Sequence, residues 1–287
     1  MPPPPVNSKA PLPPPMPKAP PPVSKTAQVN FVVSSGVEVG PERTAIYGTG
    51  GIGKSTLAAA IGNLGKNALF LDADAGSKRV ACNRLGPQQG LVDWQSLRAA
   101  LANDSLLAPY DVVILDSISR CEEWCVAHVI KTIPAGSIEK RFGSVDRLED
   151  YGYGKGFQHV YEEMKKLLAD LDRQVLAGRD VVVVAHSCKA NVPNPKGEDF
   201  IRYEPRLQTS STGKADVRSL FKEWLDHLVF VDYDISVGDD QKAIGHGTRT
   251  IYCQERPTHV AKSRSLRKPI VYDEGSFDLW TQLFAGR

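Results

Sequence analysis

This sequence of 287 residues has little net charge, few cysteines and no long apolar run, and each of these shortages excludes some classes of protein. The 35 basic and 33 acidic side chains leave a formal charge of +2 at pH 7, so nucleic-acid binding would require local clusters of cations. No apolar stretch approaches the roughly 18 residues that span a bilayer, which predicts a protein without membrane contact. The five cysteines, an odd number with no secretory signal before them, are typical of a reducing cytosol and predict a cytoplasmic protein.

Proline is concentrated at the N-terminal end, where it dominates residues 1–26 and is interrupted by Lys9, Lys18 and Lys25. This composition offers almost nothing to bury and is typical of a disordered, polyproline-like segment. We expect a tail over residues 1–26, either solvated without a specific partner or docking on a proline-recognising protein. The remaining residues, 27–287, suffice for a single domain.

Residues 48–55 match the phosphate-binding loop G-x-x-x-x-G-K-[ST], between an apolar run at 44–47 and a helix-forming run at 56–61. In this strand–loop–helix context the backbone N–H groups form a nest for phosphates at a helix N-terminus. Lys54 would reach the β- and γ-phosphates, and the Ser55 hydroxyl would bind Mg²⁺. The residues expected to contact the nucleotide are Gly48, Thr49, Gly50, Gly51, Ile52, Gly53, Lys54, Ser55 and Thr56.

Apolar runs alternate with helical patterns along the rest of the chain. The expected buried strands are residues 68–72, 111–116, 180–185 and 228–233, and the expected helices are 93–102, 157–175 and 217–226. This alternation predicts an α/β fold with a doubly wound, mainly parallel sheet that binds ligands at the carboxyl ends of its strands. The β-like pieces at 248–254 and 258–261 predict antiparallel edge strands toward the C-terminus.

Polar side chains at the strand ends supply the other groups that hydrolysis of a nucleoside triphosphate needs. Asp116 ends an apolar strand, as the Mg²⁺-binding Walker-B acid does, but Ser117 follows it where many P-loop motors have a catalytic glutamate. Asp74, just past the strand at 68–72, is the candidate to polarise the attacking water. His186, at the tip of the strand at 180–185, is the candidate sensor of the γ-phosphate. The alternatives are a loop acid for Asp74 and a capping or core histidine for His186.

The motifs that the sequence lacks distinguish among the subclasses of P-loop protein. No N-K-x-D guanine-reading motif is present, so ATP is favoured over GTP. The ParA/MinD-type partition ATPases resemble residues 50–56 and 71–74, but they need a lysine where Thr49 stands and favour a proline soon after the Walker-B acid. A small-molecule kinase is disfavoured because no arginine-rich lid follows a compact substrate pocket.

Four segments together resemble a RecA-like recombinase core: residues 45–56, 70–74, 113–117 and 184–186. The chain is more similar to the phage and prophage AAA ATPases of that superfamily, some of which are single-strand annealing proteins. That closer similarity depends on Y-G-Y-G-K-G-F at 151–157, Y-E-P at 203–205 and A-K-S-R at 261–264. The resemblance spans about residues 28–284.

The resemblance implies Lys54 and Ser55 on the phosphates and Mg²⁺, Asp116 as Walker-B acid, Asp74 at the catalytic carboxylate position and His186 at the sensor position. RecA-like proteins usually have glutamate where this chain has Asp74. A base displaced by about 1 Å can lower the rate on the order of a hundredfold. The shorter side chain therefore predicts slow turnover, with nucleotide acting more as an assembly switch than as fuel.

The resemblance also places Lys262 and Arg264 where RecA-like filaments send two basic residues across a subunit boundary onto a neighbour's nucleotide. Alternate side chains of an extended segment point the same way, so both fit one γ-phosphate. The alternative is a basic patch on a solvated edge strand, since Arg267 and Lys268 follow.

Two long segments, 135–155 and 189–218, correspond to the loops that face the filament axis in RecA-like proteins. Cations for phosphates and aromatic faces for bases are what a single-strand site uses. The second segment contains Lys189, Lys196, Phe200, Arg202, Tyr203, Arg206, Lys214 and Arg218. The acids within it, among them Glu198 and Asp199, dilute the charge, so a disordered lid stays an alternative.

The sequence therefore predicts an ATP- and Mg²⁺-dependent hydrolase that forms a homo-oligomeric ring or filament and binds single-stranded DNA in recombination or strand annealing. Its location would be the bacterial host cytoplasm if a phage encodes it. The alternative is a partition or regulatory switch ATPase that acts on a protein partner, with the proline-rich tail as its docking element.

Overall fold

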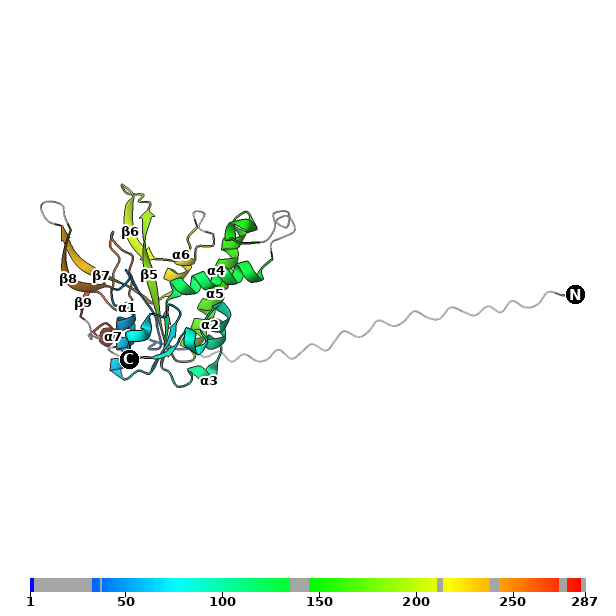
Figure 1. Ribbon diagram of the computed structural model, residues 1–287, viewed down its shortest axis with the longest axis horizontal. Coiled ribbons are helices and arrows are strands. Elements are labelled where there is room, and N and C mark those ends of the chain that lie inside the picture. The colour runs from blue at the N-terminus through cyan, green and yellow to red at the C-terminus, as the bar shows by residue number, and fades with distance from the viewer. Residues whose placement is uncertain are drawn as a thin grey trace. The chain divides into compact units, whose positions relative to one another are not determined.

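The computed structural model describes residues 1–2, 33–36, 38–134, 145–210, 214–237, 243–273 and 278–284. The chain divides into two units, Met1–Glu38 and Val39–Arg287. The second unit contains every helix and strand described below (Figure 1). The expected tail at 1–26 lies, apart from its first two residues, outside the described residues.

A nine-stranded mixed sheet forms the centre of the second unit in the described part of the chain. The strands are β1 (Arg43–Gly48), β2 (Ala68–Asp72), β3 (Asn83–Leu85), β4 (Val112–Asp116), β5 (Asp180–Val192), β6 (Phe200–Pro205), β7 (His227–Val237), β8 (Ala243–Tyr252) and β9 (Ile270–Tyr272). They lie in the order β3-β2-β4-β5-β1-β7-β8-β9, and β6 pairs with β5. Neighbours from β3 to β7 are parallel, whereas β8 and β9 join antiparallel. The predicted mainly parallel α/β sheet with antiparallel strands toward the C-terminus is confirmed.

Helices cover both faces of this sheet (Figure 1). They are α1 (Lys54–Ala59), α2 (Trp94–Leu101), α3 (Asp104–Leu107), α4 (Ile118–Thr132), α5 (Lys155–Leu176), α6 (Val217–Trp224) and α7 (Asp278–Phe284). Along β5, Val181 and Val183 belong to the hydrophobic cluster under α2, α4, α5 and α6, while Val182 and Val184 belong to the cluster under α1 and α7. The unbroken valine run is therefore explained by burial on both faces. None of the helices in the described ranges combines the length and apolar character that a bilayer crossing requires.

Two sequence expectations differ from the structure. The segment 189–218 is not one long loop, because β5 continues to Val192 and pairs antiparallel with β6. The extension does alternate Cys188, Ala190 and Val192 with polar residues, but these apolar side chains are only partly buried, and the proline and glycine that follow made the whole segment resemble a loop. The strand expected at 258–261 is reduced to isolated bridges, including Tyr203 with His259, because Arg256 and His259 exchange backbone hydrogen bonds in a turn. The outer antiparallel strand is β9, which the sequence did not indicate.

Candidate functional site

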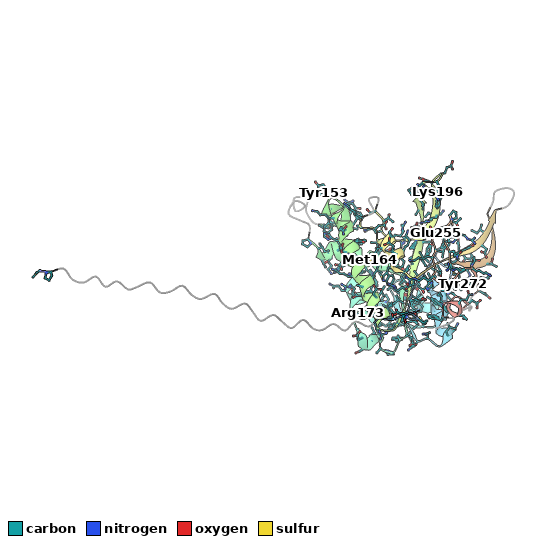
Figure 2. The ribbon with its side chains drawn as sticks, turned by 180° about the vertical axis from the view of Figure 1, so that it is seen from behind. Tyr153, Met164, Arg173, Lys196, Glu255 and Tyr272 are labelled. Atoms are coloured by element: carbon teal, nitrogen blue, oxygen red, sulfur yellow. The ribbon has the colours of Figure 1, made fainter. Side chains whose placement is uncertain are left out.

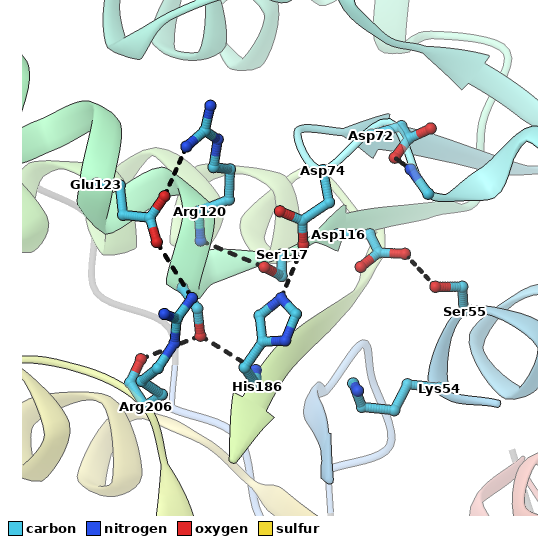
Figure 3. Close-up of polar contacts among 12 residues, drawn as sticks. Lys54, Ser55, Asp72, Asp74, Asp116, Ser117, Arg120, Glu123, His186 and Arg206 are labelled. Carbon is cyan, nitrogen blue, oxygen red and sulfur yellow. Dashed lines mark hydrogen bonds and ion pairs between the residues drawn. The ribbon is translucent and has the colours of Figure 1, made fainter. Parts of the chain in front are cut away.

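The carboxyl ends of four parallel strands meet at one edge of the sheet (Figure 3). In the sheet register Gly48 of β1 lies opposite His186 of β5, and Asp72 of β2 lies opposite Asp116 of β4. Because β5 lies between β1 and β4, the phosphate-binding loop, the acids and the histidine are gathered within a few side-chain lengths of one another.

The phosphate-binding loop is shaped by glycines at its two ends. At Gly48 an added Cβ would lie 2.4 Å from the backbone oxygen of Val231, so β1 and β7 approach this closely only with glycine. Gly53, at the N-cap of α1, has φ of 98°, a left-handed conformation that glycine adopts without strain. The Lys54 ammonium lies over the loop and donates to the backbone oxygens of Gly48 (3.0 Å) and Thr49 (2.8 Å). Burial lowers the pKa of Lys54, while Asp116 and Asp74 act in the opposite direction.

Ser55 and Asp116 offer the oxygen ligands that Mg²⁺ prefers. The Ser55 hydroxyl donates to Asp116 Oδ2 at 2.5 Å. Burial raises the pKa of Asp116 to about 6, and the neighbouring carboxylates of Asp74 and Asp72 add to the effect. A bound cation would offset the repulsion among these carboxylates and stabilise the ionised form of Asp116. Among the described residues no three His, Cys, Asp or Glu side chains cluster to hold a metal by themselves. Mg²⁺ is usually held by one or two carboxylates together with water and substrate phosphates, and Asp116 with Ser55 would supply the protein ligands.

Asp74 and His186 contact each other across 112 residues of sequence, with 3.1 Å between Asp74 Oδ2 and His186 Nε2 (Figure 3). Burial acts to raise the pKa of Asp74, but hydrogen bonds with His186 and Ser117 outweigh it, and the pKa lies below its ordinary value. The Asp74 carboxylate is therefore ionised at neutral pH, as an acceptor for the proton of an attacking water must be. The structure brings the expected base and the expected sensor into one hydrogen bond.

Asp72 fixes the position of Asp74. Its carboxylate accepts the backbone N–H groups of Gly76 (3.0 Å) and Ser77 (3.1 Å) and the Ser77 hydroxyl (2.6 Å), so it closes the turn after β2. The backbone N–H of Asp74 donates to the Asp116 carbonyl at 3.2 Å. Asp72 is thus a structural acid, and the turn it closes directs Asp74 toward β5.

The N-terminus of α4 holds the backbone of His186, through a residue that sequence reasoning missed. The Ser119 hydroxyl accepts the His186 N–H at 3.1 Å and donates to the Arg206 carbonyl at 3.0 Å. Arg206 N–H in turn donates to the His186 carbonyl at 2.8 Å. The signal for Ser119 was weak, because a serine in the first turn of a helix is ordinarily a local capping residue.

One turn further along α4, Glu122 carries a pH-dependent contribution to stability. Its Oε1 accepts the Gln208 N–H at 2.8 Å, and burial raises the pKa of Glu122 from 4.5 to about 7. The folded state therefore favours the protonated acid, and this contribution to stability is lost as pH rises through about 7. Glu122→Gln, which keeps an acceptor without charge, should raise the melting temperature by roughly 3–6 °C at pH 8. The gain should shrink below pH 7 and vanish near pH 4; an equal gain at every pH would contradict this explanation.

Lys262 and Arg264 lie at the opposite end of the strands from the phosphate-binding loop. Arg264 pairs with Asp226 at 3.0 Å, and Asp226 also pairs with Arg43 at the start of β1. The six residues of β1 span roughly 20 Å. Neither basic residue therefore reaches the phosphates of its own chain. The Arg264 side chain is 72% exposed, and Lys262 Nζ donates to the Glu223 carbonyl at 3.4 Å.

All three arginines expected to face DNA are paired within the chain. Glu204 is buried and pairs with Arg202 at 2.7 Å and with Arg218 at 3.7 Å. Arg206 pairs with Glu123 at 3.2 Å. The Tyr203 ring stacks on Phe230 with 5.3 Å between centroids. Arg202, Arg218 and Tyr203 therefore do not form the open cationic and aromatic surface that the sequence suggested. The exposed cations of the segment are Arg206 and its three lysines, Lys189, Lys196 and Lys214.

The sheet order and the phosphate-binding loop at its edge are those of a P-loop nucleotide-binding domain with a RecA-like fold. A family model described as an AAA domain matches residues 41–265, and the chain belongs to that family. No curated protein matches the chain. Among solved structures, a KaiC-like protein, PH0186, from the hyperthermophilic archaeon Pyrococcus horikoshii OT3 is similar over 82% of this chain and 86% of its own, at 10% identity and a TM-score of 0.39.

Proposed function

We propose that this protein is a Mg²⁺-dependent ATP hydrolase that assembles into a ring or filament and binds single-stranded DNA in recombination or strand annealing. The proposal depends mainly on the course of β5. His186 is the last residue of β5 that pairs in parallel with β1, and Ser187 is the first that pairs antiparallel with β6. Asp74 hydrogen-bonds with His186, and the β5–β6 hairpin, residues 187–205, begins at the next residue. A movement of Asp74 during ATP hydrolysis would therefore be passed to the hairpin through His186.

A surface pocket between the start of α5 and the segment that leads into α6 supports the DNA-binding part of the proposal. It has a volume of about 540 Å³, and its lining includes Tyr153, Lys155, Thr209 and Lys214. Tyr153 is 96% exposed, and it projects from the same edge of the molecule as Lys196 on the hairpin (Figure 2). An exposed ring in a pocket that two lysines also line suits a nucleobase and its phosphate. The described ends of both expected DNA loops meet at this pocket.

ATP hydrolysis with and without single-stranded DNA tests this function. At low salt DNA should stimulate the rate, and the stimulation should fade at moderate salt as counterions compete for the lysines. Tyr153→Ala should lose most of the stimulation but keep the basal rate. Tyr233→Ala, which changes a ring exposed on β7, is the matched control and should behave as the wild type. Equal rates with and without DNA at both salt concentrations would refute the DNA-binding part.

Arg264 is proposed to complete the site of a neighbouring subunit, since it cannot reach its own. ATP hydrolysis by the wild type should then rise more than linearly with protein concentration. Arg264→Ala should lose this rise while its nucleotide affinity stays unchanged. Arg267→Ala, in an exposed arginine of the same segment, is the control. Strictly linear activity of the wild type across its assembly range would count against a shared site.

The internal pairing of Arg202, Arg206 and Arg218 favours a second candidate, a partition or regulatory switch ATPase that acts on a protein partner. In that case the proline-rich segment at 1–26 would be the docking element. Stimulation of hydrolysis by a protein partner, together with indifference to DNA, would favour this candidate over the first.

A further inference from the structure

The C-terminal strands contact the phosphate-binding loop from its outer side. Arg249 of β8 donates from Nη1 to the Ile52 carbonyl at 3.1 Å. Tyr272 of β9 donates from its hydroxyl to the Gly53 carbonyl at 2.9 Å. The Arg249 guanidinium also lies over the Tyr272 ring, 4.5 Å from its centroid, so the two side chains support each other.

The fit of this pair against the loop is close. A Cβ added at Gly53 would lie 2.7 Å from the Tyr272 hydroxyl and 2.9 Å from Arg249 Nη1. The second glycine of the motif is therefore needed for two separate reasons, its left-handed φ and the room that Arg249 and Tyr272 occupy. Tyr272 lies beyond the range 41–265 that the family model matches.

Anchoring a carbonyl also orients an N–H group. In a planar trans peptide the C=O and the following N–H point in opposite directions. A hydrogen bond that holds the Ile52 carbonyl outward turns the Gly53 N–H inward. The Gly53 carbonyl also accepts the Leu57 N–H of α1 at 2.9 Å, so the Tyr272 hydroxyl adds a second hydrogen bond to a peptide that turns the Lys54 N–H inward. These inward N–H groups belong to the nest that receives phosphates. Without the anchors, a loop with glycine at positions 50, 51 and 53 would sample other orientations.

We propose that Arg249 and Tyr272 are positioning residues, which hold the phosphate nest in its binding conformation before the nucleotide arrives. This inference rests on the nucleotide binding proposed above and adds a specific prediction to it. The pair acts on the groups that grip the β-phosphate, so its loss affects ligands that carry a β-phosphate more than ligands that lack one. A residue that only stabilised the fold would not discriminate between them.

Calorimetric titration of the full chain with MgADP and with AMP tests the inference. Tyr272→Phe removes one hydroxyl and should weaken MgADP binding about fivefold, the effect of a single neutral hydrogen bond, while AMP binding changes less than twofold. Arg249→Met should weaken MgADP binding by a similar factor, and Arg249→Lys, which keeps a cationic donor, should recover part of the loss.

Trp280→Phe is the matched control. Trp280 of α7 donates from Nε1 to the Leu57 carbonyl of α1 at 2.6 Å, outside the nest. Its replacement should lower the melting temperature without changing the MgADP dissociation constant. Unchanged MgADP binding by Tyr272→Phe, or equal weakening of ADP and AMP, would overturn the inference. Failure of the wild type itself to bind MgADP would instead overturn the proposed function.

Discussion

Asp74→Asn is expected to reduce ATP hydrolysis by at least about a hundredfold and to leave ATP binding intact. General-base catalysis by a positioned carboxylate contributes roughly 10²–10⁴ to a rate. Asn keeps the shape of the side chain and a hydrogen-bond partner for His186, but it cannot accept a proton. The Asp74 side chain hydrogen-bonds with His186 of β5 rather than with the backbone of the loop at 48–55, so the shape of the phosphate nest should be unaffected. Single-turnover hydrolysis and ATP titration measure the two effects separately.

Glu123→Gln is the control for Asp74→Asn. Glu123 lines the same surface pocket as Asp74 but pairs with Arg120 and Arg206. Its replacement should change the hydrolysis rate less than threefold. Unchanged turnover in Asp74→Asn would exclude Asp74 as the base and direct attention to another acid of the site.

Lys54→Met is expected to weaken MgATP binding by about a hundredfold or more. Lys54 is 7% exposed, and its ammonium is held over the phosphate nest by two carbonyl groups, so the field of this charge is little screened by water. Methionine occupies similar space without the charge. Burial lowers the pKa of Lys54, which means that the charged ammonium is unfavourable in the folded protein without nucleotide. The substitution removes this buried charge, so the melting temperature of Lys54→Met should not fall substantially.

The matched control for Lys54→Met is Lys165→Met on the exposed surface of α5, where the lysine pairs with Glu162. It should bind MgATP as the wild type does. Retention of full affinity by Lys54→Met, with a preserved melting temperature, would exclude residues 48–55 as the nucleotide site.

Much of the fold follows from local patterns. The valine run of β5 is buried on both faces, and the apolar period over 157–175 falls within α5, because side-chain direction repeats every two residues in a strand and every 3.6 in a helix. The extension of β5 to Val192 escaped prediction because its apolar residues Cys188, Ala190 and Val192 form a short, partly buried alternation, and a segment with proline and glycine follows it.

The sequence alone determined the phosphate-binding loop, the acid that ends β4 and the chain order of the parallel strands β1, β2, β4, β5 and β7, since each depends on residues close together in the chain. Only the tertiary structure decided that Asp74 contacts His186, that Glu204 pairs with the arginines expected at DNA, and that Arg249 and Tyr272 hold the outer side of the loop. Tyr272 and Gly53 are 219 residues apart. Contacts over such separations depend on which strands are neighbours and in what register, and no local pattern encodes either.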